Sequence, residues 1–577
     1  MTNPSKPWPA LPLSEAHALM TAPGSLFELD EVVIRGIPTK VWKNAPPTLK
    51  EVFLFARGMF GAREFLVHED ERVTYDAFGR AVLALAEDLQ RRGVKKGDRV
   101  AIAMRNLPEW PVAFFATVLV GAIATPLNAW WTGQELEYGL KDSGSKVLIT
   151  DPERLARVAE LLAGCPDLKT VYVTRLPASP DPRLIRLEDV IGAPAAWGGL
   201  EERPLPDVPL DPEDDATIFY TSGTTGKPKG ALATHRNNTG NILALAFSYD
   251  RDFVRRGETP PVRGNPEDAQ KVGLVGIPFF HTTGCHALMI PAMIQGAKLI
   301  LMRRFDAEDA MKLIERERVT SAGGVPAIAW LILEHPSASK YDLSSLESIS
   351  YGGAPASPEL VRRLVETFPK SIPGTGWGMT ETGGTHTHHQ GGDYRNRPDS
   401  CGAVLGPYRI KITDPDGREL GPNEVGELWA FGPNILKGYW NKPEATAETF
   451  VDGWVRTGDL AKIDEEGFLF IVDRAKDMLI RGGENIYCVE VENALYEHPA
   501  VVDAAVVGRP HQTLGEEPCA VVTTKPGVSV SEAELKAFVA ERIAGFKVPV
   551  AIIVRSEPLP RNANGKILKG ELKGLFA

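Results

Sequence analysis

Helix-like and strand-like hydrophobic patterns alternate along the first part of the chain. Residues 75–92 carry apolar side chains at helical spacing, whereas 99–104 and 146–150 are short apolar runs typical of buried strands. Three later segments have the same strand-like pattern: 273–279, 298–302 and 348–351. This alternation predicts parallel βαβ units and therefore an α/β fold.

One apolar stretch is long enough to imitate a membrane span. No charged residue occurs between Trp110 and Gln134, and about 20 apolar residues suffice to cross a bilayer as a helix. Gly121 and Pro126 divide the stretch, however. We therefore expect a buried helix, a turn and a buried strand inside an α/β core.

The pattern also divides the chain into regions. Residues 1–50 are proline-rich and predicted to be an irregular lead-in, and 250–270 read as a charged excursion from the core. A large N-terminal domain of doubly wound α/β subdomains is expected over 51–473. Within it, residues 400–472 have short strands separated by Asp-Gly and Glu-Gly turns, as in a small antiparallel sheet or β-barrel. Residues 474–577 are expected to form a small mixed α/β C-terminal domain.

Composition narrows the class of protein. The chain has 577 residues, too many for one hydrophobic core, and a net charge of −11, which argues against nucleic-acid binding. Its N-terminus lacks the apolar core of a signal peptide. Five scattered cysteines without CxxC spacing fit a reducing, cytoplasmic compartment without disulfides or structural zinc. His386, His388 and His389 lack carboxylate or cysteine partners at ligand spacing, so we expect them in a solvated loop.

The strongest chemical signal is the glycine- and hydroxyl-rich segment 220–230, which reads YTSGTTGKPKG and follows the apolar run 216–220. Glycines let backbone N–H groups close around a phosphate, hydroxyls donate further hydrogen bonds, and lysine supplies a positive charge. Pro228 stands where a Walker loop needs Ser or Thr for its metal. The segment therefore predicts a phosphate-binding loop of another kind.

This loop resembles the signature of the adenylate-forming superfamily, which includes acyl-CoA synthetases, luciferases and peptide-synthetase adenylation domains. Six further motifs follow in the order that the superfamily uses, so the resemblance spans about residues 50–570. They are PFFHTTG at 278–284, YGGAP at 351–355, GWGMTET at 376–382, GWVRTGD at 453–459, FIVDRAKD with GGENI at 470–486, and NANGK at 562–566.

The resemblance implies a nucleotide site and a metal site. Trp377 would stack on adenine, in place of the tyrosine common in the family, and Thr221 and Glu381 would bind Mg²⁺, a cation that prefers oxygen ligands. Asp459 and Arg474 would contact the ribose. The residues implied to bind ATP or AMP are Thr221, Ser222, Gly223, Thr224, Thr225, Gly226, Lys229, Gly353, Ala354, Pro355, Trp377, Gly378, Met379, Asp459 and Arg474.

The remaining motifs imply the catalytic residues, the interdomain hinge, the residues that face CoA and the acyl pocket. Catalysis would fall to Lys566, Thr380, Glu381 and His281. Lys476 would be the hinge about which a mobile C-terminal domain rotates, and Gly482 and Gly483 would face CoA. The acyl pocket would include His281, Gly284, Val325, Gly352 and Gly376. Tyr487 and Cys488 follow the hinge motif where the family commonly has proline, so a small local change is expected there.

Together these motifs imply an ATP-dependent carboxylic acid:CoA ligase that forms an acyl-AMP and then a thioester. The overall likeness is to bacterial medium- and long-chain fatty-acid:CoA ligases, which favours a fatty or similar hydrophobic acid. Open alternatives are an aryl-acid:CoA ligase, an acyl-AMP ligase that supplies a carrier protein, a luciferase-like oxygenase and a nucleotide sensor without catalysis. The implied partners are the acid, ATP and CoA, and a homodimer is an option.

Overall fold

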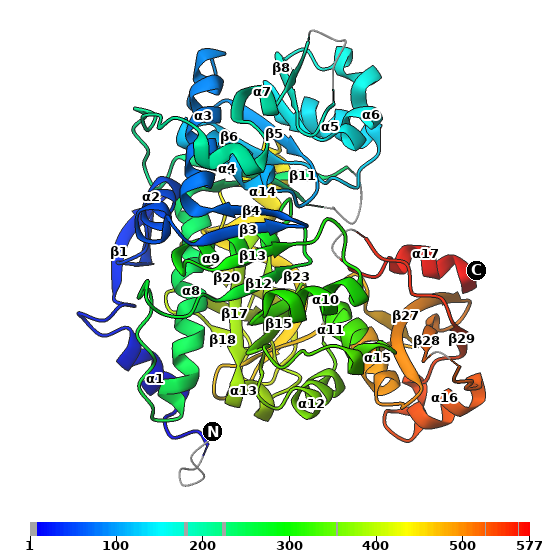
Figure 1. Cartoon of the computed structure of the whole chain (residues 1–577). Helices are drawn as coiled ribbons and strands as arrows, with labels where there is room; N and C mark the ends of the chain where they lie inside the picture. The colour runs from blue at the N-terminus through cyan, green and yellow to red at the C-terminus, as the bar shows by residue number, and fades with distance from the viewer. Residues whose placement is uncertain are drawn as a thin grey trace.

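Two large sheets form the body of the protein (Figure 1). The computed structural model describes residues 8–177, 183–221, 227–353, 356–525, 527–562 and 565–576. The first sheet has eight strands in the order β21 (Gly438–Tyr439), β11 (Lys229–Thr234), β10 (Asp215–Thr221), β6 (Ile123–Pro126), β5 (Arg99–Ala103), β7 (Val147–Thr150), β8 (Thr170–Val173) and β9 (Leu184–Arg186). Parallel pairing from β10 through β9 confirms the expected α/β architecture.

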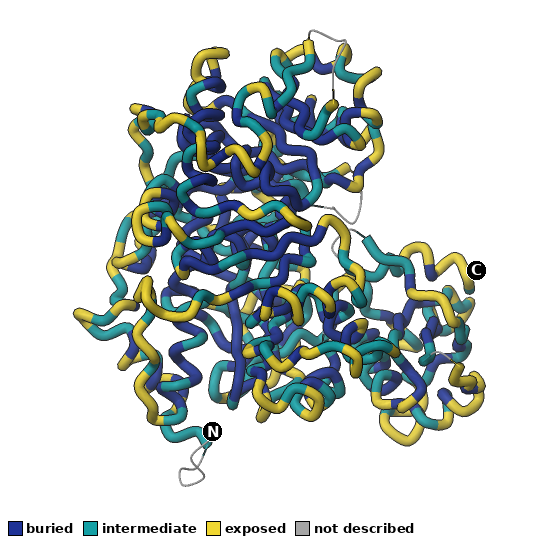
Figure 2. The backbone as a smooth tube through the Cα atoms, viewed as in Figure 1, coloured by how far each residue is buried: buried dark blue, intermediate teal, exposed yellow. Residues whose placement is uncertain are grey.

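The second sheet has nine strands, and its centre is also parallel. Its order is β18 (Ala403–Val404), β17 (Gly384–Gln390), β16 (Ile372–Met379), β15 (Ser348–Gly352), β14 (Ser321–Gly324), β12 (Val272–Val275), β13 (Lys298–Leu301), β3 (Glu64–His68) and β4 (Glu71–Thr74). Figure 2 shows that the central strands are mostly buried. Strands covered on both faces read as continuous apolar runs, which is why the sequence revealed them.

Helices cover both sheets, and a largely apolar core cluster joins α2, α3, α4 and α9. The helices of the large domain are α1 (Leu13–Met20), α2 (Leu49–Phe60), α3 (Tyr75–Arg91), α4 (Glu109–Leu119), α5 (Gly133–Ser143), α6 (Pro152–Val158), α7 (Glu188–Ile191), α8 (His235–Arg255), α9 (Ile290–Ile294), α10 (Ala307–Glu317), α11 (Pro326–Leu333), α12 (Pro358–Thr367), α13 (Gly391–Asn396) and α14 (Pro443–Thr449). The long apolar stretch folds as α4, a turn and β6, as expected. Within the described ranges, none of the helices could cross a bilayer.

Two five-stranded sheets and one two-stranded sheet complete the described fold. A five-stranded antiparallel sheet occupies the region predicted to be β-rich: β19 (Arg409–Thr413), β20 (Gly426–Phe431), β22 (Phe450–Val451), β23 (Trp454–Ile463) and β24 (Leu469–Arg474). The small C-terminal domain contains β25 (Leu479–Arg481), β26 (Glu484–Ile486), β27 (Val501–His511), β28 (Gly515–Thr524) and β29 (Ala551–Arg555), with α15 (Cys488–Tyr496), α16 (Glu532–Ala540) and α17 (Lys569–Lys573). In Figure 1 this domain lies beside α11.

Three expectations about local structure were wrong in whole or in part. The region predicted as an irregular lead-in contains α1 and a hairpin of β1 (Leu29–Ile34) and β2 (Ile37–Trp42). The expected excursion at 250–270 is correct from residue 256 onward, where the chain is largely exposed and forms no helix or strand before β12, but its first residues belong to α8, which continues to Arg255. Its charged side chains suggested a surface segment, but Arg255 is buried in an ion pair with Asp393, with a nitrogen–oxygen distance of 2.9 Å. Buried charges with partners are compatible with a core helix.

The third wrong expectation concerns the three histidines, which lie on the buried strand β17 instead of a solvated loop. His386 and His389 each pair a ring nitrogen with a backbone carbonyl oxygen, and Nδ1 of His388 lies 2.7 Å from the Ser248 hydroxyl. Burial lowers the pKa of His386 to about 4 and that of His388 to about 3. These side chains therefore stay neutral near pH 7 and pack the strand against α8.

Candidate active site

The sequence motifs meet where strands of both sheets end. β14, β15 and β16 are parallel, and ligands of such sheets bind outside the carboxyl ends of the strands. Gly353, at the end of β15, has a φ of 75°, which favours glycine. Thr221 ends β10 in the other sheet. Of the predicted nucleotide-binding residues, 222–226 and 354–355 lie outside the described residues.

Trp377, Asp459 and Arg474 lie together on three strands. Trp377 on β16 donates from its indole nitrogen to Oδ2 of Asp459, at 2.8 Å. Asp459 and Arg474 face each other across β23 and β24, and Nε of Arg474 lies 3.5 Å from the other carboxylate oxygen. Burial raises the pKa of Asp459, and Arg474 opposes that rise. An aromatic ring held in this way can stack on a nucleotide base, and the carboxylate can accept hydrogen bonds from the hydroxyls of a sugar.

Glu381 is held beside Tyr439 and Lys229. The Tyr439 hydroxyl donates to Oε1 of Glu381 at 2.6 Å, and Nζ of Lys229 lies 4.8 Å from the centre of the Tyr439 ring. Burial raises the pKa of the Glu381 carboxyl, against the pull of Tyr439 and Lys229. A hard cation such as Mg²⁺ would favour the ionised carboxylate, so this donor set fits the metal.

The segment that follows Glu381 is held in place by residues that the sequence motifs did not reveal. Asn241 on α8 donates to the Gly383 carbonyl and accepts from the Thr385 backbone N–H, and Asn434 donates to the Thr382 carbonyl. Buried amides that satisfy loop backbone groups fix the loop geometry. The sequence motifs did not reveal Tyr439 either, because a half-buried Tyr beside a candidate metal ligand has no sequence signal of its own.

Lys566 extends from the C-terminal domain toward this group of residues. Burial, together with the positive charges of Arg474 and Lys476, lowers its pKa to about 8, and Asp459 opposes this shift. The neighbouring Gly565 packs tightly on the large domain, because a Cβ there would lie 2.6 Å from Cγ2 of Val325. The described arrangement therefore brings Lys566 together with Asp459 and Arg474, and its loop against Val325.

His281 lies in the loop that follows β12 of the nine-stranded sheet, and this loop contacts a residue that follows β5 of the other sheet. Asn106, which follows β5, accepts from the Phe279 backbone N–H and donates to the Ile277 carbonyl. Nδ1 of His281 accepts from the Thr283 backbone N–H at 3.3 Å, which leaves the proton of the neutral ring on Nε2. Burial lowers the pKa of His281 to about 4. Near pH 7 it can therefore donate a hydrogen bond but carries no charge.

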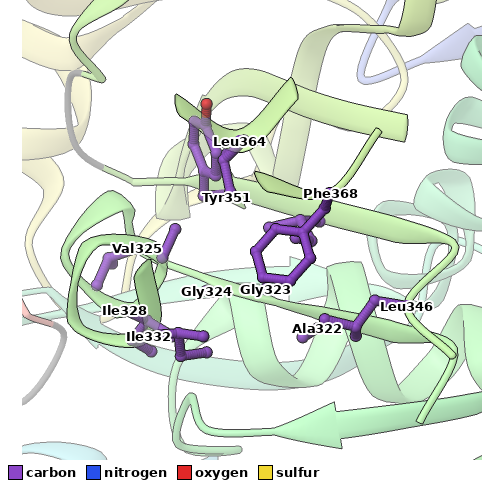
Figure 3. Close-up of a pocket in the computed structure, with 12 residues that line it drawn as sticks. Ala322, Gly323, Gly324, Val325, Ile328, Ile332, Leu346, Tyr351, Leu364 and Phe368 are labelled. Carbon is purple, nitrogen blue, oxygen red and sulfur yellow. The ribbon is translucent and has the colours of Figure 1, made fainter. Parts of the chain in front are cut away.

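The predicted acyl pocket is only partly brought together. Val325 lines a small apolar cavity between β14, β15 and helices α11 and α12, seen in Figure 3. Gly284 faces its own loop, since a Cβ there would lie 2.2 Å from the Pro278 carbonyl oxygen, and a Cβ on Gly376 would meet Thr387 of β17. The other lining residues are Ala322, Gly323, Gly324, Ile328, Ala329, Ile332, Leu346, Ile349, Tyr351, Leu364 and Phe368.

The hinge and CoA motifs occupy turns. Lys476 is exposed between β24 and β25, in a turn closed by a hydrogen bond from the Asp477 N–H to the Arg474 carbonyl. Gly482 and Gly483 form the turn between β25 and β26, with φ values of 61° and 91°. Cys488 begins α15, and its backbone N–H donates to Asp473 on β24. Proline has no backbone N–H, so a cysteine in place of the family's proline adds a hydrogen bond next to the hinge.

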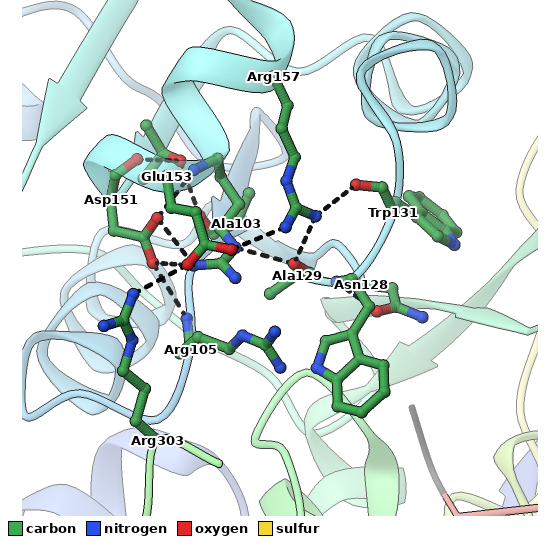
Figure 4. A network of polar contacts seen from close by, with 12 residues as sticks. Ala103, Arg105, Asn128, Ala129, Trp131, Asp151, Glu153, Arg157 and Arg303 are labelled. Atoms are coloured by element: carbon green, nitrogen blue, oxygen red, sulfur yellow. Dashed lines mark hydrogen bonds and ion pairs between the residues drawn. The ribbon is translucent and has the colours of Figure 1, made fainter. Parts of the chain in front are cut away.

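The sequence motifs also did not reveal a cluster of arginines at the carboxyl ends of β5, β7 and β13 (Figure 4). Arg154, Arg157 and Arg303 pair with Asp151 and Glu153. The Arg105 guanidinium has no carboxylate within ion-pair distance among the described residues, and it lies 4.8 Å from the ring centre of Trp130, which is 41% exposed. The cluster thus carries a surplus of positive charge beside an exposed aromatic ring.

Two protein-family models match the chain. The model described as AMP-binding enzyme matches residues 56–440, and that described as AMP-binding enzyme C-terminal domain matches 490–566. A feruloyl-CoA synthase from Amycolatopsis sp is 36% identical over 88% of this chain and 95% of its own length. A long-chain-fatty-acid–CoA ligase from Bacillus subtilis is 35% identical over 91% of this chain and 94% of its own.

Solved structures are similar over nearly the full length. An anthranilate CoA ligase in complex with anthranoyl-AMP has a TM-score of 0.80 at 25% identity, covering 92% of this chain and 97% of that one. An o-succinylbenzoate CoA synthetase from Bacillus subtilis, in complex with its acyl-adenylate intermediate, has a TM-score of 0.74 at 30% identity, covering 92% and 98%.

Proposed function

The chain belongs to the AMP-binding enzyme family and is an ATP-dependent acid:CoA ligase, and from this premise we propose that its substrate is a fatty or similarly hydrophobic carboxylic acid. The apolar lining next to Val325 supports this proposal; the cavity there, about 10 Å³, has room for a water-sized group in this arrangement, so its side chains would move apart to admit a tail. Its wall consists of aliphatic, aromatic and glycine residues, and Gly323 and Gly324 are closely packed against Ser350 and Ile328. An apolar tail there would be removed from water, which favours binding.

In the first step, the acid's carboxylate attacks the α-phosphate of ATP, so that an acyl-AMP forms and pyrophosphate leaves. An anion must approach a polyanion, so positive charge and positioning supply most of the acceleration. The position of Lys566 near Asp459, Arg474 and Val325 supports a role for its ammonium group in bringing the carboxylate to the α-phosphate. Thr380 would contact the α-phosphate and Lys229 the β- and γ-phosphates, while neutral His281 would donate a hydrogen bond beside the acyl group. Glu381 and Thr221 would hold Mg²⁺, which neutralises phosphate charge when bound.

In the second step, the CoA thiol attacks the carbonyl carbon of the acyl-AMP, and AMP leaves as the thioester forms. Lys566 and the thiol could not both occupy the opening beside the acyl-AMP, so the C-terminal domain would rotate about Lys476. Gly482 and Gly483 would then face the pantetheine arm, where the absence of side chains leaves room. The arginine cluster around Arg105 supports a place for the phosphates of CoA, and Trp130 supplies an exposed ring for its adenine.

An aryl acid is the second candidate. It is favoured by the relative named as a feruloyl-CoA synthase and by the structure that holds anthranoyl-AMP. Pyrophosphate release should be measured with ATP and Mg²⁺ across acetate, hexanoate, dodecanoate, hexadecanoate, benzoate and cinnamate, with and without CoA. We expect CoA-dependent turnover to be highest for hexanoate or longer chains.

Each other outcome of that panel has a distinct meaning. A preference for benzoate or cinnamate would replace the fatty assignment by the aryl one. Adenylate formation that ignores CoA would favour an acyl-AMP ligase that supplies a carrier protein. No pyrophosphate with any acid would contradict both steps proposed above.

Replacing Arg105 by alanine is expected to raise the KM for CoA about tenfold, because a charge-assisted hydrogen bond to phosphate contributes about 1.5 kcal/mol or more. Adenylate formation without CoA should stay unchanged. Arg316→Ala is the matched control, since Arg316 is another exposed arginine of the large domain that pairs with Glu317. An unchanged KM for CoA in Arg105→Ala would exclude this cluster as the phosphate site.

A further inference from the structure

Tyr496, Asp503 and Arg561 connect the surface of the C-terminal domain to the loop that carries Lys566. The Tyr496 hydroxyl donates to Oδ1 of Asp503 at 2.8 Å, and the other oxygen of that carboxylate accepts from Arg561 at 2.5 Å. A second nitrogen of the Arg561 guanidinium donates to the Gly565 carbonyl oxygen, next to Lys566. One planar guanidinium thus holds both Asp503 on β27 and the backbone of the loop 562–566 that carries Lys566, called the lysine loop below.

The same chain of contacts begins on the large domain. The Trp330 ring on α11 stacks on the Tyr496 ring, with centroids 6.4 Å apart and planes inclined by 6°. Glu334, one turn further along the chain, pairs with Lys525 of the C-terminal domain at 3.5 Å. Val325, just before α11, contacts the loop at Gly565. One short stretch of the large domain therefore meets the C-terminal domain at Tyr496, at Lys525 and at the lysine loop.

We propose that Tyr496, Asp503 and Arg561 form a brace that positions Lys566 for adenylate formation, and that Trp330 engages this brace when the C-terminal domain is docked as described here. These four are positioning residues, because they act through the loop and do not touch the reacting atoms. The inference rests on the proposed role of Lys566 in the function above.

The geometry explains why a brace is needed. The Asn562 N–H donates to the Lys566 carbonyl, and the Lys566 N–H donates to the Asn562 side chain. These bonds hold Asn562 and Lys566 together but do not set the direction of Lys566 relative to the domain. Arg561 supplies that direction through Asp503, and the Trp330 stack sets the orientation of the domain on α11. A displacement of about 1 Å in a catalytic group can reduce a rate about 10²-fold.

The contacts also assign the brace to one half of the reaction. Trp330 and Tyr496 belong to different domains, so rotation about Lys476 would separate the two rings. The second step, in which the lysine loop leaves the opening, should then proceed without the brace. The alternative is that the lysine loop alone directs Lys566, in which case Arg561 only stabilises the domain.

The test compares both half-reactions in the full-length enzyme, using the acid that gives the highest turnover in the panel. Arg561→Met should lower kcat for ATP–pyrophosphate exchange about 10²-fold, with little change in the KM for ATP. Thioester formation from the synthetic acyl-AMP and CoA should remain near the parent rate. Tyr496→Phe, which keeps the ring but removes the hydrogen bond to Asp503, and Trp330→Leu should give smaller losses confined to the same step. Arg561→Lys should recover part of the lost rate.

Controls separate positioning from folding and from the assignment of Lys566. Arg509→Met removes another arginine of the C-terminal domain, one that pairs with Glu517, and should leave both steps unchanged. In Arg561→Met, the alkaline limb of adenylate formation should move above pH 8 as Lys566 leaves its buried, cationic surroundings. Unchanged exchange, or an equal loss in both steps, would overturn the brace. If Lys566→Met itself leaves exchange intact, the proposed function of Lys566 fails instead.

Discussion

Replacing Lys566 by methionine is expected to slow adenylate formation about 10²–10³-fold, the loss typical of removing one preorganised group that stabilises transition-state charge. Methionine keeps most of the side-chain volume but removes the cation that would lie between the carboxylate and the α-phosphate. ATP–pyrophosphate exchange measures this step. Thioester formation from the synthetic acyl-AMP should stay near the parent rate, because the proposed rotation would remove Lys566 from the site before that step.

The same lysine sets the expected pH dependence. Its pKa is lowered to about 8, so the ammonium form predominates below pH 8 and is lost as the pH rises through that value. For exchange, kcat/KM should therefore fall above about pH 8, whereas thioester formation from acyl-AMP should not show this limb. Lys566→Arg should move the limb to higher pH, since arginine keeps its charge. Lys573→Met, at an exposed lysine on α17, is the matched control. A Lys566→Met enzyme with normal exchange would contradict the assignment.

Lys476→Pro is expected to have the opposite effect on the two steps. Lys476 lies in the exposed turn between β24 and β25, and proline would fix its φ near −65° and oppose the rotation. Thioester formation from acyl-AMP should fall about 10²-fold or more, because the domain could not reach the second arrangement. Exchange should stay within severalfold of the parent, since the described arrangement already places Lys566 beside Arg474 and Asp459.

Lys476→Ala distinguishes the backbone effect from the loss of the side chain. Alanine leaves the backbone free to rotate, so both half-reactions should remain near parent rates. Full thioester formation by Lys476→Pro would exclude rotation about this residue. A parallel loss in Lys476→Ala would instead assign the effect to the lysine side chain.

Hydrophobic pattern and glycine-rich motifs predicted most of the fold, because both record strong local constraints. The buried strands of the two sheets read as short apolar runs. In the long apolar stretch, Gly121 lies between α4 and β6, and Pro126 ends β6. The errors came from buried polar residues. The charges at the end of α8 and the histidines of β17 are satisfied by partners distant in sequence, such as Asp393 and Ser248, which a local pattern cannot show.

The candidate site likewise contains some residues that the sequence could reveal and others that it could not. Lys566, Asp459, Arg474 and Trp377 stand in motifs, and the fold brings them together. Tyr439, Asn241, Arg105 and Arg561 could not be chosen from the sequence, since each matters through a contact with one distant residue or loop. Gly284 shows the converse limit: its motif suggested an open acyl pocket, but the glycine is required by the close approach of the Pro278 backbone.

The Trp330 stack on Tyr496 has a practical consequence for time-resolved work. Indole emission shifts to longer wavelengths in water, and Trp330 is 8% exposed while the two domains are docked. Each turnover that separates the rings would therefore change the intrinsic fluorescence of one of the protein's 11 tryptophans. The difference between the parent enzyme and Trp330→Phe in a stopped-flow experiment would then report the rotation directly, without a dye or an engineered cysteine.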